Sequence, residues 1–271
     1  MLKAIFKNLR TGVVTTRYPA VPAEPPDGFR GAPQLRPGSL ADALPPASFC
    51  PSGAIAVATG ESPFRLDLGR CVFCGRCAEP GPEGGESAIA IGRRFELAAR
   101  NRHQLVLEVT PDADGRATAR AAEPAGDQVS AIIRRTLGRS LHLRHLDSGS
   151  CNACDWELTA LLNPVYDVRR LGIDFVASPR HADGVIVTGP VTRNLETAVR
   201  RTYEAVPAPR IVIAVGACAV SGGIVGQSYA SAGGVAEVLP VDVFIPGCPP
   251  RPEAIIFGIL LAIGRLTARP G

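Results

Sequence analysis

Hydrophobic and polar positions in the second half of the chain follow one repeated pattern. Short runs typical of β-strands alternate with runs of helical period. The runs predict strands over residues 141–146, 172–176, 184–188, 210–215 and 241–245, and helices over 157–162, 195–205 and 253–263. Strand, loop and helix in repeated order are typical of a parallel sheet with helices on both faces.

The helix predicted over residues 253–263 is hydrophobic on nearly every side, and for such a helix we expect burial rather than exposure to a membrane partner. The longest hydrophobic run, residues 254–264, is too short to span a bilayer. The start of the chain lacks the pattern of a signal peptide. These features predict a protein that associates with a membrane at most peripherally.

The first half of the chain is less regular. Residues 1–48 include a stretch rich in proline and glycine and are expected to form an extended arm or linker, or a poorly ordered terminus. Residues 49–97 are compact and rich in cysteine. Residues 98–139 are expected to form a polar linker with one strand, 104–109, and a basic helix, 130–139. The remainder, residues 140–271, is the second domain.

Cysteine usage and charge narrow the chemistry. All eight cysteines fall in clustered spacings, and in a chain without an export signal this favours metal binding over disulfides. The formal net charge is +4, which gives no case for nucleic-acid binding. Two [4Fe–4S] clusters with four thiolates each would add about −2 apiece and bring the loaded chain close to neutral. A near-neutral protein tends to associate, as a subunit does.

Four cysteines belong to the predicted parallel sheet domain. Cys151 and Cys154 are separated by two residues, whereas Cys218 and Cys248 are single, and Cys151, Cys218 and Cys248 each come soon after a predicted strand. Ligands gather beyond the carboxyl ends of parallel strands, so we expect these residues to meet. Four thiolates suit a [4Fe–4S] cluster or a zinc ion. Glycine lies one or two residues before three of them (Gly149, Gly216, Gly247), where the backbone can approach a bulky centre.

The other four cysteines resemble part of a bacterial ferredoxin. Cys71, Cys74 and Cys77 have the spacing of the first three ligands of a ferredoxin run, whose fourth position here is Gly81. In two-cluster ferredoxins the fourth cysteine of a run binds the other cluster, and Cys50, which proline follows, has the form of such a cysteine.

Counting back from Cys50 by the same spacing gives Leu40, Ala43 and Pro46, none of which can bind iron. One cluster site therefore keeps all four ligands (Cys50, Cys71, Cys74, Cys77), and the other has lost all four. Two hydrophobic repeats, residues 50–57 and 87–91, also indicate an internal duplication.

The N-terminal part resembles the ferredoxin-like, two-cluster subunit of formate hydrogenlyase-type complexes and the corresponding subunit of respiratory complex I. The residues that carry the resemblance are Phe6 to Gly12, Tyr18-Pro19, Phe29-Arg30-Gly31, Cys50-Pro51 and the run from Cys71 to Cys77. The missing second cluster is the departure from that family. The resemblance implies a small α+β ferredoxin-like domain.

Residues 135–265 resemble the small subunit of group 4 [NiFe] hydrogenases and the 20 kDa, B-type subunit of complex I. The motifs are Ser150 to Glu157, Gly216-Ala-Cys218-Ala and Pro246 to Pro252. Complex I has adjacent cysteines at the first motif, whereas Asn152 and Ala153 separate them here, which favours the hydrogenase branch. The resemblance implies an α/β flavodoxin-like parallel sheet domain, so the chain looks like a fusion of two neighbouring subunits.

The resemblance also implies a function. Cys151, Cys154, Cys218 and Cys248 would hold the [4Fe–4S] cluster nearest the active site of a hydrogenase-type large subunit, and the N-terminal cluster would relay electrons to further ferredoxin-like and membrane subunits. The chain would be a non-catalytic electron-transfer subunit with two [4Fe–4S] clusters, cytoplasmic and held on the inner face of the membrane by its partners. Glu157 would move protons at the large-subunit interface, or would be a helix N-terminal carboxylate favoured by the dipole.

Other interpretations stay open at this point. One is a B-type subunit of a complex I-like quinone oxidoreductase, or of a related complex without nickel. Others are a zinc-stabilised interaction module and a thioredoxin-like dithiol enzyme that uses Cys151 and Cys154. The remaining polar residues of the motif, Asp155 and Trp156, are expected to cap or pack. The four histidines (His103, His142, His145, His181) share no spacing with cysteines and are expected at the surface or in packing.

Overall fold

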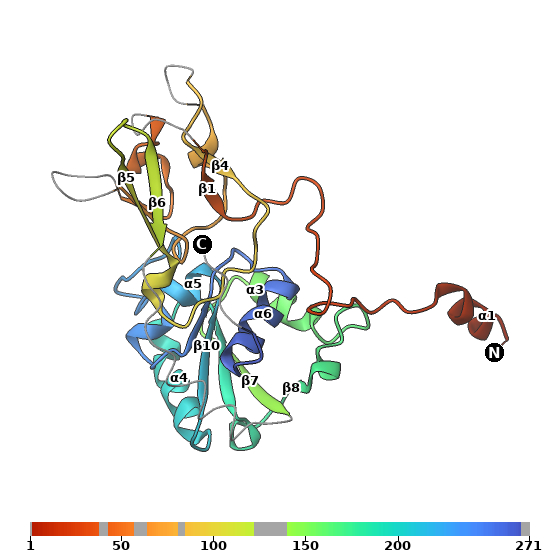
Figure 1. Cartoon of the computed structure of the whole chain (residues 1–271). Coiled ribbons are helices and arrows are strands. Elements are labelled where there is room, and N and C mark those ends of the chain that lie inside the picture. Colours follow the sequence, from red (N-terminus) through yellow and green to blue (C-terminus); the bar gives the residue numbers. More distant parts are fainter. Residues whose placement is uncertain (1, 38–42, 57–63, 81–84, 122–139, 267–271) are drawn as a thin grey trace.

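The computed structural model describes residues 2–37, 43–56, 64–80, 85–121 and 140–266. Its largest sheet has five parallel strands in the order β11-β10-β9-β7-β8 (Figure 1). These strands are β7 (Leu141–Asp147), β8 (Ile173–Phe175), β9 (Gly184–Thr188), β10 (Ile211–Val215) and β11 (Val243–Ile245). Counted along the chain, the order is that of flavodoxin-like folds, so the predicted fold class of this domain is confirmed.

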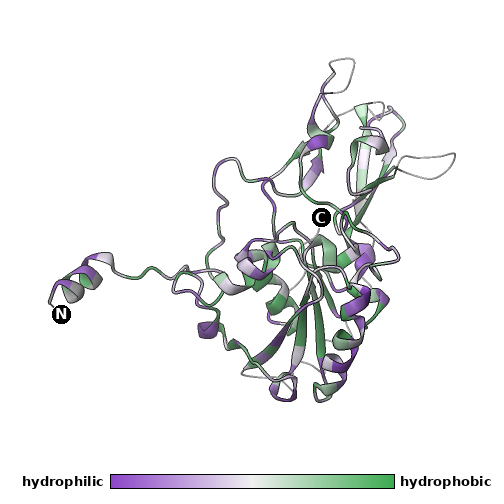
Figure 2. Cartoon of the chain, turned by 180° about the vertical axis from the view of Figure 1, so that it is seen from behind, coloured by the Kyte–Doolittle hydropathy of each residue, from purple (hydrophilic) through white to green (hydrophobic). Residues whose placement is uncertain are grey.

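Helices cover both faces of this sheet, as the strand pattern predicted. One hydrophobic cluster contains residues of α3 (Ala153–Ala160) and α6 (Pro252–Ala262), and another contains residues of α4 (Arg193–Ala205) and α5 (Gly216–Ser221). Strands β9 and β10 are buried along their whole length because both of their faces are covered. The green colour of the central strands in Figure 2 reflects this hydrophobic character. Helix α5 is the one α-helix among the described residues of this domain that the periodicity did not predict.

Every residue of α6 is buried, so the expected burial of this helix is confirmed. Gly258 allows the helix to lie close to the sheet, since a Cβ there would come within 2.3 Å of Ile245 Cδ1. Tyr18 of the arm and Ala98 belong to the same hydrophobic cluster as the helix, and Arg100 donates to its Leu261 carbonyl. No helix among the described residues is long and hydrophobic enough to cross a membrane.

The N-terminal part contains two small antiparallel sheets. Strands β1 (Pro33–Leu35) and β4 (Ile89–Ile91) form one pair. Strands β2 (Ile55–Ala56), β3 (Phe64–Asp67), β5 (Val106–Pro111) and β6 (Ala117–Ala121) form the other sheet in that order. The two repeated hydrophobic segments therefore form β2 and β4, in different sheets.

Residues 98–121 differ from the linker that the polar sequence indicated. They contain β5 and β6, which complete the sheet of β2 and β3. The segment reads as polar because β5 is only partly buried, with one fully buried position, Val109. The basic helix expected over residues 130–139 lies outside the described residues.

The arm also contains regular structure. Helix α1 (Leu2–Thr11) projects away from the rest of the molecule in both views (Figures 1 and 2). The chain then runs along the parallel sheet domain, where the Thr16 N–H donates to the Val165 carbonyl at 2.8 Å and the Tyr18 hydroxyl donates to Glu96 at 2.7 Å. Tyr18 is buried. Thr16 and Tyr18 therefore attach this segment to the rest of the molecule, whereas residues 12–14 are exposed.

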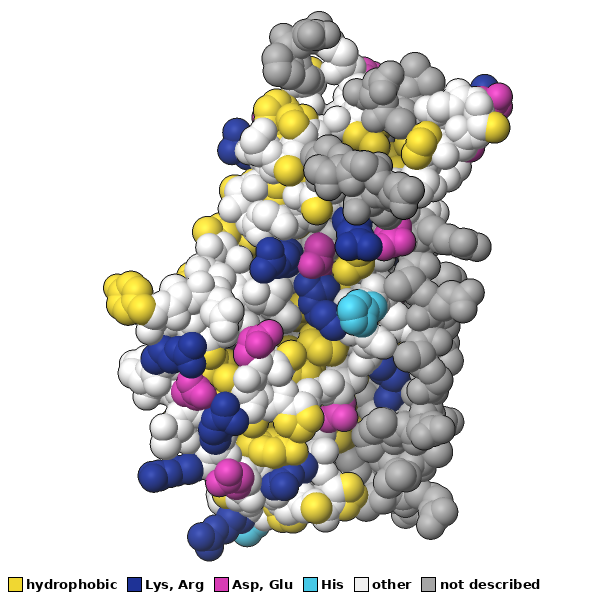
Figure 3. Space-filling view, turned by 90° about the vertical axis from the view of Figure 1, so that its left-hand side faces the viewer, with side chains coloured by type: hydrophobic (Ala, Val, Ile, Leu, Met, Phe, Trp, Pro, Cys, Tyr) yellow, Lys and Arg dark blue, Asp and Glu magenta, His cyan; other side chains and the backbone are white. Residues whose placement is uncertain are grey.

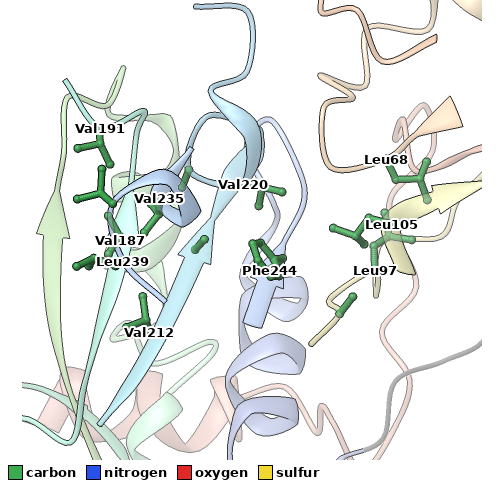
Figure 4. Packing of buried hydrophobic residues seen from close by; sticks show 14 of the residues in the cluster. Leu68, Leu97, Leu105, Val187, Val191, Val212, Val220, Val235, Leu239 and Phe244 are labelled. Atoms are coloured by element: carbon green, nitrogen blue, oxygen red, sulfur yellow. The ribbon is translucent and has the colours of Figure 1, made fainter. Parts of the chain in front are cut away.

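The two halves of the chain share one hydrophobic cluster. Leu68, Leu97 and Leu105 of the N-terminal part lie in the same cluster as Phe244 and Val220 of the sheet domain (Figure 4). Ala99 and Phe244 exchange backbone hydrogen bonds of 3.0 and 2.8 Å, which extends the edge of the parallel sheet by one antiparallel bridge. On the face drawn in Figure 3, acidic side chains lie among the lysines and arginines.

Candidate functional site

The structure brings the four C-terminal cysteines to one edge of the parallel sheet. Cys151 lies in the loop after β7 and Cys154 in the first turn of α3, whereas Cys218 lies in α5 directly after β10 and Cys248 follows β11. Burial raises the pKa of the Cys154 thiol, and the negative charges of Cys218, Cys248 and Cys151 raise it further. The four cysteines therefore lie near enough for their charges to affect one another.

Two glycines lie directly against these sulfur atoms. A Cβ on Gly216, whose φ is +89°, would come within 2.5 Å of Cys154 Sγ. A Cβ on Gly223, whose φ is +57°, would come within 2.8 Å of Cys218 Sγ. Of the three glycines singled out in the sequence, only Gly216 has this role; Gly149 and Gly247 are packed against Thr192 and Pro250.

Polar side chains behind the Cys151 loop fix its shape. Asp147 Oδ1 accepts hydrogen bonds from the N–H groups of residues 149 and 150 at 2.9 and 2.7 Å. Asp155 accepts from the hydroxyl of Thr188 at 2.7 Å and from the hydroxyl of Ser150, and its Oδ1 lies 2.8 Å from His145 Nε2. Burial lowers the pKa of His145, although the adjacent Asp155 partly opposes the shift. His145 and Asp155 thus belong to a polar network that sequence spacing did not indicate.

The four N-terminal cysteines line a single small pocket. Cys50 ends the short 3-10 turn η2 (Ala47–Phe49), Cys71 and Cys74 lie in the loop after β3, and Cys77 lies in η3 (Arg76–Ala78). The remaining walls are largely hydrophobic and include Ile55, Leu66 and Ile91. Left-handed backbone conformations at Phe73 and Gly75 bend the loop around this pocket.

Burial and repulsion from neighbouring cysteines make the Cys71 and Cys77 thiols costly to ionise without a cation. Burial raises the pKa of Cys71 to about 12 and that of Cys77 to about 11, and neighbouring cysteines add to both shifts. Backbone N–H groups oppose this cost: Phe73 donates to Cys71 Sγ at 3.3 Å, and Ala54 donates to Cys50 Sγ at 3.1 Å. At Cys50, burial raises the pKa, but hydrogen bonds from Ser52 and backbone groups outweigh it, and the pKa is lowered.

Both donor sets fit a polynuclear iron–sulfur cluster. Each consists of four thiols without a fifth donor type, and backbone N–H groups or close glycines surround the sulfur atoms. A metal core supplies the positive charge that deprotonates coordinating thiols. Among the described residues, no three His, Cys, Asp or Glu side chains form a group suited to a single metal ion. In a [4Fe–4S] cluster each thiolate binds a different iron.

The two cysteine sets face a common cavity of about 620 Å³ between the halves of the chain. Cys74 of the N-terminal set and Cys248 of the C-terminal set both line it, together with Glu157, Tyr166 and Arg251. The N-terminal cysteine set is therefore adjacent to the C-terminal set. Of the four degenerate positions, Ala43 and Pro46 are described, whereas Leu40 and Gly81 lie outside the described residues.

Glu157 points to the same cavity. It is the fifth residue of α3, and the acidic residue in the first turn of this helix is Asp155. Burial raises the pKa of Glu157, Glu253 raises it further, and Arg251 partly opposes these effects. A carboxylate stabilised by the helix dipole is expected in the first turn, so this interpretation, considered for Glu157, applies better to Asp155. Trp156, expected to pack or cap, is instead 74% exposed.

Comparisons with known proteins identify relatives of the sheet domain. The family model described as NADH ubiquinone oxidoreductase, 20 Kd subunit, matches residues 151–262. The probable membrane-bound hydrogenase subunit mbhJ of Pyrococcus furiosus is 50% identical over 137 residues, which cover 51% of this chain and 82% of that protein. Formate hydrogenlyase subunit 7 of Escherichia coli is 40% identical over 158 residues, which cover 58% and 62%.

A third relative is the B-type subunit of the NADH-quinone oxidoreductase of Citrifermentans bemidjiense, which is 48% identical over 107 residues, covering 40% of this chain and 62% of that protein. Among solved structures, a chain of the archaeal membrane-bound sulfane sulfur reductase matches 49% of this chain and 76% of its own length, with 33% identity and a TM-score of 0.43. The chain belongs to the family of the 20 kDa subunit of NADH–ubiquinone oxidoreductase, which includes relatives in membrane-bound hydrogenases and formate hydrogenlyase.

Proposed function

We propose that this chain is an electron-transfer subunit of a hydrogenase-related complex and holds two [4Fe–4S] clusters. Cys151, Cys154, Cys218 and Cys248 would bind one cluster, and Cys50, Cys71, Cys74 and Cys77 the other. The observation that carries the proposal is the gathering of all eight cysteines into two sets of four, with one member of each set, Cys74 and Cys248, lining a common cavity. When bound, each cluster would take up and release one electron at a time.

The chain's own residues would tune and protect this relay. N–H groups that donate to Cys50 and Cys71 stabilise negative charge on sulfur and thereby favour the reduced state. The hydrophobic walls of the N-terminal pocket exclude water, and burial of a charged cluster opposes the addition of an electron. The N-terminal domain is thus proposed to be a ferredoxin-like domain fused in front of the 20 kDa subunit domain.

The surface beside the C-terminal set supports a large-subunit partner. Cys151 and Cys248 are exposed, as is the ring of Trp156 two residues after Cys154. Ile224 and Val225 are exposed directly after Gly223, which touches Cys218. Large exposed hydrophobic side chains mark interaction surfaces. We propose that a hydrogenase-type large subunit covers them, and that ferredoxin-like and membrane subunits complete a complex on the inner face of the membrane.

Glu157 is proposed to exchange protons at that interface. Its raised pKa keeps a proton on the carboxyl group up to a higher pH than in a solvated glutamate. The side chain lines the cavity between the cysteine sets, where the acquisition of an electron by either cluster would favour protonation further.

A second candidate is a B-type subunit of a complex I-like quinone oxidoreductase or of a nickel-free relative. The similarity to the NADH-quinone oxidoreductase of Citrifermentans bemidjiense favours it. The two candidates differ in the partner, because a [NiFe] large subunit needs its own cysteine pairs for nickel. Metal analysis of the co-purified complex distinguishes them: nickel supports the hydrogenase function, and its absence with quinone reductase activity supports the alternative.

The cluster proposal is tested by anaerobic iron and acid-labile sulfide determination, with EPR spectroscopy of the dithionite-reduced protein. We expect about eight irons per chain, four for each cluster, and two interacting [4Fe–4S] signals. Four irons would show that one ligand set is wrong. Stoichiometric zinc without labile sulfide would refute the proposal.

A further inference from the structure

Arg251 lies at the junction between the two cysteine sets. It follows Cys248 by three residues and precedes α6, and both residues line the shared cavity. Its guanidinium group binds Glu253 with two hydrogen bonds, Nε to Oε2 at 2.8 Å and Nη2 to Oε1 at 2.7 Å. The two side chains are only 16% and 5% exposed, so this ion pair is nearly buried. Glu253 therefore holds the plane of the guanidinium in a fixed orientation.

The fixed guanidinium lies within cation–π distance of two aromatic rings of the N-terminal half. Its Cζ lies 4.7 Å from the ring centroid of Phe95 and 5.3 Å from that of Phe29. The two rings also contact each other edge to face, with centroids 6.3 Å apart. Arg251 of the sheet domain thus contacts Phe29 of the arm and Phe95 of the segment after β4.

The arm continues this connection to the N-terminal cysteines. Arg30, next to Phe29, donates from Nη1 to the carbonyl oxygen of Cys74 at 2.6 Å. The following backbone is paired with residues 92–94: the Gly31 N–H donates to Gly92 at 2.9 Å, and the Ala32 N–H donates to Arg94 at 2.8 Å. The sequence Phe29-Arg30 therefore joins the loop of Cys74 to Arg251, three residues from Cys248.

We propose that Arg251 is a positioning residue that sets the separation of the two cluster sites by clamping Phe29 and Phe95. This inference rests on the proposed two-cluster function. Electron transfer between clusters depends steeply on their distance, and the contacts of Arg251 with Phe29 and of Arg30 with Cys74 link the segments that carry Cys248 and Cys74. Only arginine combines a planar face for two rings with a fork for Glu253, so lysine cannot replace it fully.

The test uses the intact, anaerobically purified protein with Phe29→Ala, Arg251→Lys and Arg251→Ala. Phe29→Ala removes one clamped ring and leaves the Arg251–Glu253 ion pair intact, so it does not leave a buried charge unpaired. The matched control is Arg210→Ala, since Arg210 stacks on Tyr203 at 4.2 Å in the α4–β10 region, away from both cysteine sets. The measurements are iron content, the magnetic splitting between the two reduced clusters, and amide hydrogen exchange at Gly31 and Ala32.

Because all eight cysteines remain, we expect full iron content in each variant. We expect Phe29→Ala and Arg251→Ala to lose the defined magnetic splitting between the two reduced clusters, since dipolar coupling falls with the cube of the distance. We also expect the amide hydrogens of Gly31 and Ala32 to exchange faster in both variants. Arg251→Lys should show a smaller loss, and Arg210→Ala none. Full iron with an unchanged splitting in Phe29→Ala and Arg251→Ala would overturn the positioning role alone. A wild-type protein with only one cluster would overturn the proposed function and this inference with it.

Discussion

Replacement of Gly216 by alanine tests the closest contact between backbone and sulfur in the proposed C-terminal cluster site. The added Cβ would lie 2.5 Å from Cys154 Sγ and 3.6 Å from the carbonyl oxygen of Gly247. Gly216 also has a φ of +89°, which non-glycine residues rarely adopt. Because Cys154 is held in the first turn of α3, its sulfur can give way only if the loop or the helix moves.

The expected cost has two parts. The left-handed backbone costs about 1–2 kcal/mol for any residue with a Cβ. Overpacking against a fixed neighbour adds about 1–3 kcal/mol. Gly216→Ala should therefore lower the free energy of unfolding by about 2–5 kcal/mol in all.

Gly226→Ala separates the two parts. Gly226 has a φ of +64°, but a Cβ there would meet no atom within 4 Å. This control should cost only the backbone term of about 1–2 kcal/mol. Anaerobic urea denaturation measures both variants, and iron and sulfide determination measures cluster content. We expect Gly216→Ala to lose about half of its iron, one cluster of two, and Gly226→Ala to keep it. Equal stability and full iron in both variants would refute the argument that Gly216 makes room for the thiolate.

Three further predictions rest on the described contacts. Cys50→Ser should remove about four irons and leave the C-terminal cluster, whereas full iron would contradict the assignment of Cys50 as the fourth ligand. Glu157→Gln should become more stable relative to the wild type as the pH rises above 4.5, because a raised pKa means that ionising Glu157 costs the folded state free energy. Thermal unfolding of both proteins across this range should give plots of melting temperature against pH that diverge. Parallel plots would contradict the raised pKa. Asp67→Ala should cost about 1.5–3 kcal/mol in urea denaturation, since its oxygens accept from Arg102 at 2.7 and 2.6 Å just before the Cys71 loop. The exposed control Glu108→Ala, which breaks a surface ion pair, should cost at most about 1 kcal/mol, and a similar loss in both would argue against a special role for Asp67.

The sequence by itself determined the architecture of the sheet domain and the composition of both donor sets. Strands β9 and β10 coincide closely with the hydrophobic runs because a strand buried on both faces must be hydrophobic along its length. Since parallel strands bring their carboxyl ends together, the placement of cysteines after β7, β10 and β11 already implied that they meet. The spacing in the sequence predicted that Cys50 joins Cys71, Cys74 and Cys77 in one ligand set, and all four cysteines line one pocket.

The tertiary structure decided what depends on contacts between distant segments. The contact between His145 and Asp155 and the cation–π contact of Arg251 with Phe29 join positions whose separation in the chain has no regular period. Residues 106–121 form a hairpin because β3 offers them an edge to pair with, although their polar sequence indicated a linker. Local sequence encodes which face of an element is hydrophobic, but only the folded chain determines which residues from different elements come within reach of one another.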